Sequence, residues 1–196
     1  MVASSPKCLA ISSTDTAPAL IALDAEVELV CRSGARRVPL SSLYQNDGMI
    51  YMTRRSDEIV TAVHLPARTG WRSSYWKLRR RGSIDFPVLG VAAAVKIGAS
   101  GGVEDARLVL GAVSSQPLVA HDAAQSLLGR ELSDDAIEAA AEKAAKLAKP
   151  MDNADFELHW RKAVTGHYVA GILRALRGDD PKALPPLARR AALAAC

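Results

Sequence analysis

The spacing of apolar and polar residues changes character near residue 121. Before that point, apolar residues alternate with polar ones in several short runs, which is the period of a half-buried β-strand. After it, apolar residues recur every three or four positions, which is the period of an amphipathic helix. The pattern therefore predicts an α+β chain in which strands are followed by helices.

The first third of the chain predicts a short helix, a hairpin and one further strand. Residues 19–25 are mostly apolar and follow Pro18, a residue suited to the first turn of a helix. Residues 25–40 alternate about a Ser-Gly turn, as a β-hairpin does. Residues 58–66 read as a strand that Pro66 ends, and the segment between hairpin and strand has the turn residues of a loop.

The remainder predicts a small antiparallel three-stranded sheet packed with a three-helix bundle. Segment 66–72 has the composition of a connector, so we place a domain boundary there. A glycine-rich turn joins the last two strand-like runs. The strand-like runs are residues 74–81, 87–97 and 104–113, and the helices are residues 120–129, 134–149 and 154–177.

Composition narrows the class of protein. With 49% hydrophobic and 23% charged residues, the chain is typical of globular proteins. It has no apolar run of transmembrane length and no secretory signal at its start, so we expect a cytoplasmic protein without membrane contact. Its three cysteines, Cys8, Cys31 and Cys196, are far apart, and its four histidines lack chelating spacing. We therefore expect neither a disulfide framework nor a metal site.

Basic residues concentrate at Arg72 and in the run Arg79-Arg80-Arg81, within a net charge of +4. Nucleic-acid binding through this run is one hypothesis, because a basic patch attracts phosphate. An anionic ligand, a subunit contact or a solvated face would explain the same cluster. We favour these local explanations and expect no nucleic-acid partner.

Asp15 and Lys77 are the two candidate site residues that the pattern itself singles out. Asp15 lies in a polar loop before a helix, where it or Thr16 can cap the helix, or where it can bind the hydroxyls of a ligand. Lys77 alternates with apolar neighbours, so it faces either inward or a solvated edge. The sequence has no Gly-x-Ser-x-Gly elbow, P-loop or Cys-x-x-Cys motif, which removes the strongest signatures of hydrolase, nucleotidase and dithiol chemistry.

Five segments in order resemble landmarks of a known family. They are "SSTDTAPALIALDAEVEL", "GARRVPLSSLY", "DEIVTAVHLP", "SYWKLRRRGSIDFPVLGVAAAV" and "LLGRELSDDAIEAAA". Together they resemble the FAD-binding subunit of the molybdenum hydroxylases, a family that includes xanthine dehydrogenase, carbon monoxide dehydrogenase and 4-hydroxybenzoyl-CoA reductase. The resemblance runs from about residue 8 to about residue 178.

The resemblance implies an FAD-binding electron-transfer subunit. Such a subunit receives electrons from a molybdopterin subunit through an iron–sulfur subunit and passes them from FAD to an external acceptor. Molybdopterin and iron–sulfur clusters would belong to those partner subunits, as would the substrate chemistry, so no catalytic residue is expected here. The family pattern assigns flavin contacts to Ser13, Thr14, Asp15 and Lys77, with Ile59 or Val60 as an apolar wall.

The chain departs from the family pattern at its start. Family members carry an N-terminal lobe whose glycine-rich segments hold the FAD pyrophosphate, and this sequence resembles only the part that follows. We thus expect residues 1–68 to be the C-terminal part of an FAD-binding domain, residues 69–178 the family's C-terminal domain and residues 179–196 a flexible tail. Cys8 reads as a relic or structural cysteine. The alternative function is an assembly module that has lost FAD, and a homodimer is an expected form of the isolated chain.

Overall fold

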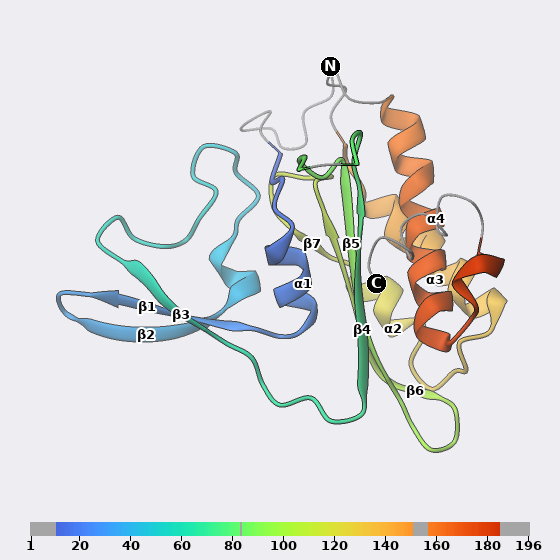
Figure 1. Cartoon of the computed structure of the whole chain (residues 1–196). Coiled ribbons are helices and arrows are strands. Elements are labelled where there is room, and N and C mark those ends of the chain that lie inside the picture. The colour runs from blue at the N-terminus through green and yellow to red at the C-terminus, as the bar shows by residue number, and fades with distance from the viewer. Residues whose placement is uncertain (1–10, 83, 151–156, 185–196) are drawn as a thin grey trace.

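The computed structural model describes residues 11–82, 84–150 and 157–184. Within these ranges the chain forms two antiparallel sheets, four α-helices and two short 3₁₀ helices (Figure 1). The strands are β1 (Glu26–Cys31), β2 (Gly34–Pro39), β3 (Ile59–His64), β4 (Trp71–Leu78), β5 (Leu89–Ile97), β6 (Val103–Gly111) and β7 (Leu118–Val119). The helices are α1 (Thr16–Ala22), α2 (His121–Gln125), α3 (Asp134–Leu147) and α4 (Leu158–Arg177), with η1 (Leu40–Leu43) and η2 (Pro181–Ala183) as the 3₁₀ helices.

The first sheet has the strand order β2-β1-β3, so both the predicted hairpin and the predicted strand 58–66 are confirmed. Val27 and Leu29 of β1 are buried against α1 and η1. The pairing of β1 with β3 shifts register between Glu28 and Leu29, where β3 contributes one extra residue. Because of this bulge, Val60 and Val63 both pair with the buried residues of β1 and share their face.

The second sheet has four strands in the order β4-β5-β6-β7, so the prediction of three strands was wrong by one. β7 has only two residues, which is too short for alternation to show in the sequence. It forms because the chain folds back after β6 and pairs with Val109 and Leu110. β4 also begins at Trp71, inside the segment that we expected to be a connector.

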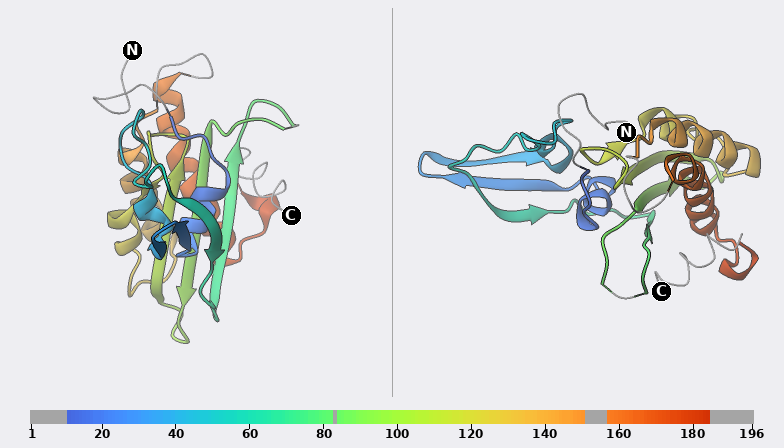
Figure 2. Two further views of the ribbon diagram at one scale, coloured as in Figure 1. Left: turned by 90° about the vertical axis from the view of Figure 1, so that its left-hand side faces the viewer. Right: turned by 90° about the horizontal axis from the view of Figure 1, so that it is seen from above.

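The four-stranded sheet lies between two layers of other elements (Figure 2). α2, α3 and α4 cover one face, and α1 with the three-stranded sheet lies on the other. β5 is buried on both faces from Leu89 to Val95, which explains its nearly continuous apolar sequence. The boundary predicted near residues 66–72 stays a prediction, and α1 shares a core with β5 and β6 across it.

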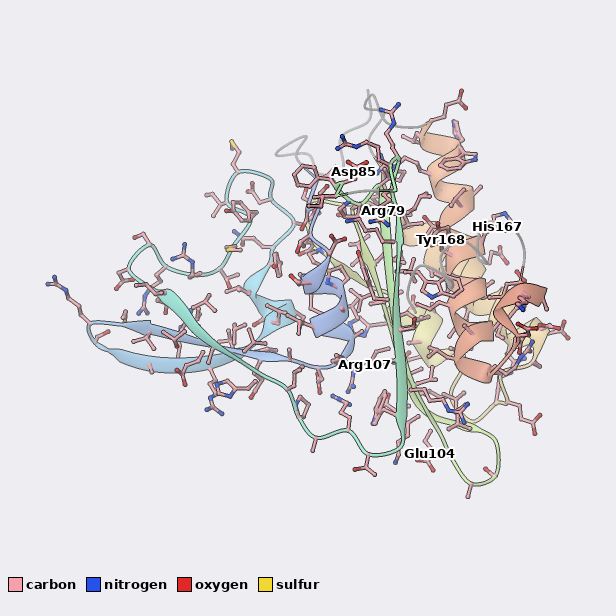
Figure 3. All side chains as sticks on the ribbon, viewed as in Figure 1. Arg79, Asp85, Glu104, Arg107, His167 and Tyr168 are labelled. Atoms are coloured by element: carbon pink, nitrogen blue, oxygen red, sulfur yellow. The ribbon has the colours of Figure 1, made fainter. Side chains whose placement is uncertain are left out.

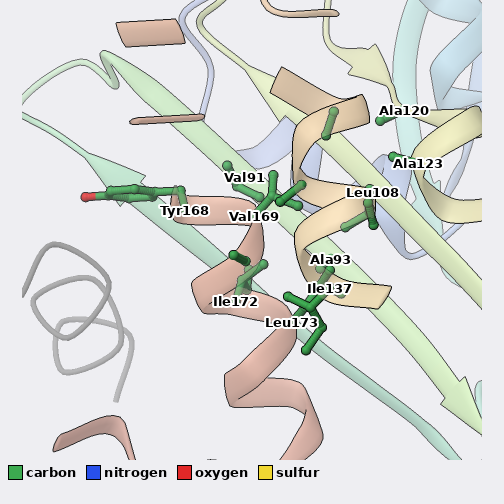
Figure 4. Packing of buried hydrophobic residues seen from close by; sticks show 14 of the residues in the cluster. Val91, Ala93, Leu108, Ala120, Ala123, Ile137, Tyr168, Val169, Ile172 and Leu173 are labelled. Carbon is green, nitrogen blue, oxygen red and sulfur yellow. The ribbon is translucent and has the colours of Figure 1, made fainter. Parts of the chain in front are cut away.

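The helix layer follows the predicted periodicity. Ser133 caps α3, because its hydroxyl accepts a hydrogen bond from the Ala136 amide at 3.3 Å. Tyr168, Val169, Ile172 and Leu173 of α4 are buried where this helix packs against β4, β5 and α3 (Figure 4). Trp160 has the same four-residue spacing as the apolar residues of this helix, but it is 37% exposed. The expected beginning of this helix, at residues 154–156, lies outside the described residues, as does most of the expected tail.

No helix in the described part of the chain combines the length and the apolar character that crossing a bilayer requires.

Candidate functional site

Asp15, Tyr75 and Lys77 meet between α1 and β4. One carboxylate oxygen of Asp15 accepts a hydrogen bond from the Tyr75 hydroxyl at 2.9 Å. The other accepts from the Lys77 ammonium group at 2.7 Å. The chain thus joins two residues that are 62 positions apart in the sequence into an ion pair.

Asp15 does not cap α1, so that interpretation was wrong. The residue occupies the N-cap position, but its side chain makes no capping hydrogen bond to the helix. Both carboxylate oxygens bind side chains of β4 instead. An ammonium group adds the attraction of opposite charges to its hydrogen bond, which a neutral backbone amide does not, and this is a physical reason for the choice.

β4 presents its side chains alternately to the two layers. Trp76 is buried among the helices and meets Tyr168 edge to face, with ring centroids 6.2 Å apart. Tyr75 and Lys77 therefore point to the opposite face, where α1 lies. The Lys77 side chain is only 19% exposed, so it does not lie on a solvated edge.

Tyr75 reaches Asp15 because Gly90 leaves space for its ring. A Cβ atom on Gly90 would lie 2.8 Å from the Tyr75 hydroxyl oxygen. Burial raises the pKa of Tyr75, and the hydrogen bond to the Asp15 carboxylate acts in the same direction. The phenol therefore stays protonated at neutral pH and remains a hydrogen-bond donor to Asp15.

The loop between β4 and β5 supplies a second partner for Lys77. The backbone carbonyl of Asp85 accepts a hydrogen bond from the Lys77 ammonium group at 2.5 Å. The Asp85 carboxylate accepts from the amides of Arg81 and Phe86, and the Arg81 guanidinium lies 3.4 Å away. The hydrogen bond with Arg81 is the main cause that lowers the pKa of Asp85. One arginine of the basic run thus closes its own loop, at the end of the sheet opposite Glu104 (Figure 3).

Ser13 and Thr14 lie beside the ion pair, on a segment fastened to the end of β6. The Ser12 amide donates to Ser114, and the Ser12 carbonyl accepts from the Ala112 amide. Ser13 borders a cavity of about 110 Å³, whose other lining residues are Ile11, Arg80, Asp85, Phe86, Pro87, Val88 and Arg161. This volume is below the roughly 300–1,000 Å³ of pockets that enclose a drug-sized ligand. The cavity is therefore too small to enclose a flavin.

Ile59 and Val60 do not join this group. They are the first residues of β3 and pair with Val30 and Leu29, toward the β1–β2 turn and away from α1 (Figure 1). Ile59 is 69% exposed and Val60 is 44% exposed. Their assignment as an apolar wall stays a prediction.

Three residues near the site were not predicted as contacts. Tyr75 was detectable, because the alternation that places Lys77 on one face places Tyr75 on the same face. The carbonyl of Asp85 and the buried Arg161 had no sequence signal, since both act through backbone groups that packing alone brings near. Among the described residues, no three His, Cys, Asp or Glu side chains are grouped to hold a metal ion. Cys8 and Cys196 lie outside those residues, and Cys31 is a partly exposed free thiol.

The donor set suits a ligand that has both carbonyl and hydroxyl groups. Lys77 offers an ammonium group, which can bind a ring carbonyl or nitrogen. Ser13 and Thr14 offer hydroxyls, and Asp15 offers carboxylate oxygens, all of which can bind the hydroxyls of a ribityl chain. These residues therefore fit one side of a flavin.

Two family models match the chain. The CO dehydrogenase flavoprotein C-terminal domain matches residues 73–176, and the FAD binding domain in molybdopterin dehydrogenase matches residues 7–68. The first match contains Lys77 and the second contains residues 13–15, so the ion pair joins residues of both.

Curated relatives and solved structures show the same likeness. The glyceraldehyde dehydrogenase medium chain of Sulfolobus acidocaldarius is 29% identical over 79% of this chain and 56% of its own length. The xanthine dehydrogenase FAD-binding subunit of Escherichia coli is 24% identical over 87% of this chain and 60% of its own. A carbon monoxide dehydrogenase structure from Hydrogenophaga pseudoflava matches with a TM-score of 0.78 and 25% identity, over 84% of this chain and 56% of that one. The chain thus spans less than two thirds of the length of these relatives.

Proposed function

Since the chain belongs to the family of FAD-binding medium subunits of the molybdenum hydroxylases, we propose that it forms one side of an FAD site in an electron-relay complex. Ser13, Thr14 and Asp15 would bind the ribityl chain and ring edge, and Lys77 would bind the isoalloxazine. When bound, FAD accepts electrons and releases them to an acceptor, while the protein supplies position and electrostatics. Partner subunits with iron–sulfur clusters and molybdopterin would deliver those electrons.

The observation that carries this proposal is the Asp15–Lys77 ion pair. It joins the part of the chain that matches an FAD-binding domain to the part that matches a flavoprotein C-terminal domain. Asp15 orients the ammonium group, and Tyr75 and the Asp85 carbonyl hold that pair from two sides. The cationic group is thereby fixed at a junction where a flavin could contact both parts.

The alternative, an assembly module without FAD, is also supported by one observation. Asp15 and Lys77 already satisfy each other, so a flavin must compete with an internal ion pair. Under this alternative the pair fastens α1 to β4 and the chain contributes a folded surface to a complex. Flavin binding by the purified chain distinguishes the two functions.

A titration of the full chain with FAD tests the proposal, with retention of flavin absorbance after desalting as a second measurement. Lys77→Met should weaken FAD binding by about tenfold or more, because it removes a charge-assisted hydrogen bond. Lys96→Met is the matched control, since Lys96 lies on the same sheet and also stands 2.7 Å from a carboxylate, that of Glu104.

The titration distinguishes the FAD site from the assembly module. Weakening by Lys77→Met alone supports the flavin site. Equal affinity in both variants removes Lys77 from the site. If the unmodified chain retains no FAD, the assembly function takes the place of the proposal for this chain.

A further inference from the structure

Arg161 is a buried cation in the first turn of α4, only 3% exposed. One terminal nitrogen of its guanidinium donates to two backbone carbonyls, those of Val88 and Ala112, each at 2.8 Å. These carbonyls stand 73 and 49 positions away in the sequence. A single side chain thus connects three segments of the chain.

The two carbonyls belong to the two segments that border the Asp15–Lys77 pair. Val88 ends the loop whose Asp85 carbonyl binds Lys77, and the Val88 amide closes that loop by donating to Leu78 at 2.8 Å. Ala112 follows β6, and its amide donates to Ser12, three residues before Asp15. Arg161 therefore contacts the loop that binds Lys77 through its Val88 carbonyl. Through the Ala112 carbonyl it contacts the residue that binds Ser12, in the segment that carries Asp15.

The backbone at Ala112 has an unfavourable conformation. Its φ is +63°, in the left-handed region that a residue with a side chain rarely adopts. Such a conformation persists where surrounding contacts determine it. Here the amide and the carbonyl of Ala112 are both hydrogen-bonded, the first to Ser12 and the second to Arg161.

Core packing alone does not explain a guanidinium at this position. Removing a charged group from water is costly, and apolar residues of similar volume usually serve a core at least as well. The hydrogen-bonding capacity of arginine is useful here, because buried carbonyls without a partner are also costly. One Nη2 group satisfies both carbonyls and holds them near each other.

From these contacts we infer that Arg161 is a positioning residue of the flavin site. It holds the 79–88 loop and the 11–15 segment in the arrangement in which Asp15 meets Lys77. The claim that this arrangement matters for FAD binding rests on the proposed function. The claim that Arg161 holds the two segments does not. Arg161 itself need not touch the flavin.

Amide hydrogen exchange on the full chain without FAD tests the structural part. Arg161→Met should accelerate exchange about fivefold or more in both segments, because the loop loses the hydrogen bond at Val88 and the 11–15 segment loses the support of Ala112, whose amide donates to Ser12. Arg161→Lys should partly restore protection, since an ammonium group can still donate to a carbonyl. Arg177→Met is the matched control: Arg177 is on the same helix and also donates to a carbonyl, that of Leu132 at 2.8 Å. If Arg161→Met does not fold, the comparison of Arg161→Lys with Arg177→Met decides.

FAD titration of the same variants tests the link to flavin. The inference is supported if the Arg161 variants alone show both faster amide exchange in the two segments and weaker FAD binding. Uniform acceleration across the chain, protection unchanged in the two segments, or loosened segments with unchanged FAD affinity would each overturn it. If the unmodified chain binds no FAD, the proposed function fails, and the exchange data still decide whether Arg161 holds the segments.

Discussion

At the scale of single residues, the candidate site depends on two glycines as well as on its polar side chains. Gly90 allows the Tyr75 ring to lie across β5 and reach Asp15. Gly111 allows α1 to approach β6, because a Cβ atom there would lie 2.7 Å from Cγ of Pro18. Both glycines therefore permit the close packing that places Asp15 beside β4.

Replacement of Gly90 by alanine should destabilise the chain. The added Cβ would displace the Tyr75 ring and break its hydrogen bond with Asp15, at a cost of about 1–3 kcal/mol. Gly166→Ala, in α4, is the contrasting variant, since its Cβ would meet Ala145 Cβ at 3.6 Å and the Ala141 carbonyl oxygen at 3.8 Å, which are ordinary contact distances. Gly166→Ala should raise the free energy of unfolding by about 0.5–1 kcal/mol, because alanine has the higher helix propensity.

Chemical denaturation measures the free energy of unfolding of both variants. A Gly90→Ala variant as stable as the parent would contradict this account.

At the scale of elements, an ion pair secures the first sheet across its central strand. Glu58, just before β3, accepts two hydrogen bonds from Arg36 of β2, at 2.7 and 3.0 Å, above the strand β1 that separates them. The Arg55 amide donates to the same carboxylate at 2.8 Å. Alternation in the sequence predicts strand pairing. It does not predict the Arg36–Glu58 ion pair, because β2 and β3 are not neighbours in the sheet.

The Glu58 carboxylate should make folding stability sensitive to acid. The hydrogen bonds from Arg36 lower its pKa to about 2, against an ordinary value of 4.5. The carboxylate therefore stabilises the fold above about pH 4.5, and this stabilisation is lost as pH falls from there toward 2. Melting temperatures from pH 7 to pH 3 should fall less steeply for Glu58→Gln than for the parent chain, although the variant starts lower. Glu26→Gln, which removes an exposed carboxylate of β1, is the matched control. A slope for Glu58→Gln parallel to that of the parent would exclude Glu58 as the cause.

At the scale of the whole molecule, most of the exposed large apolar side chains in the described part of the chain lie between residues 49 and 65. Most other large apolar residues of the described chain are buried in two cores. Exposed apolar side chains concentrated in one stretch of the chain favour association. The exposed residues of the region are Met49, Ile50, Tyr51, Ile59, Val60, Val63 and Leu65.

We expect the purified chain to self-associate through this region. Val60 and Val63 share one face of β3 because of the bulge, so the double variant Val60→Lys with Val63→Lys places two like charges on that face. It should weaken association by about tenfold or more in sedimentation velocity. Ile84→Lys serves as the control, because Ile84 is also exposed, at 95%, but lies in the 79–88 loop outside the region. Similar association of all three proteins would exclude the region as the contact.

Local sequence pattern accounts for much of this protein. It contained the α+β order of elements, the β1–β2 hairpin, the Ser133 cap and the landmarks of the family, because each depends on residues close together in the chain. It also singled out Asp15 and Lys77 as polar residues in unusual settings.

The contacts of those residues depend on how the chain folds. Asp15 binds Lys77 and Tyr75 rather than its own helix, the two-residue strand β7 completes the second sheet, and Arg161 joins two distant carbonyls. Periodicity reports which face a residue occupies but not which segment packs on that face. The partners are chosen by packing between segments tens of residues apart, so they emerge only when the chain is folded.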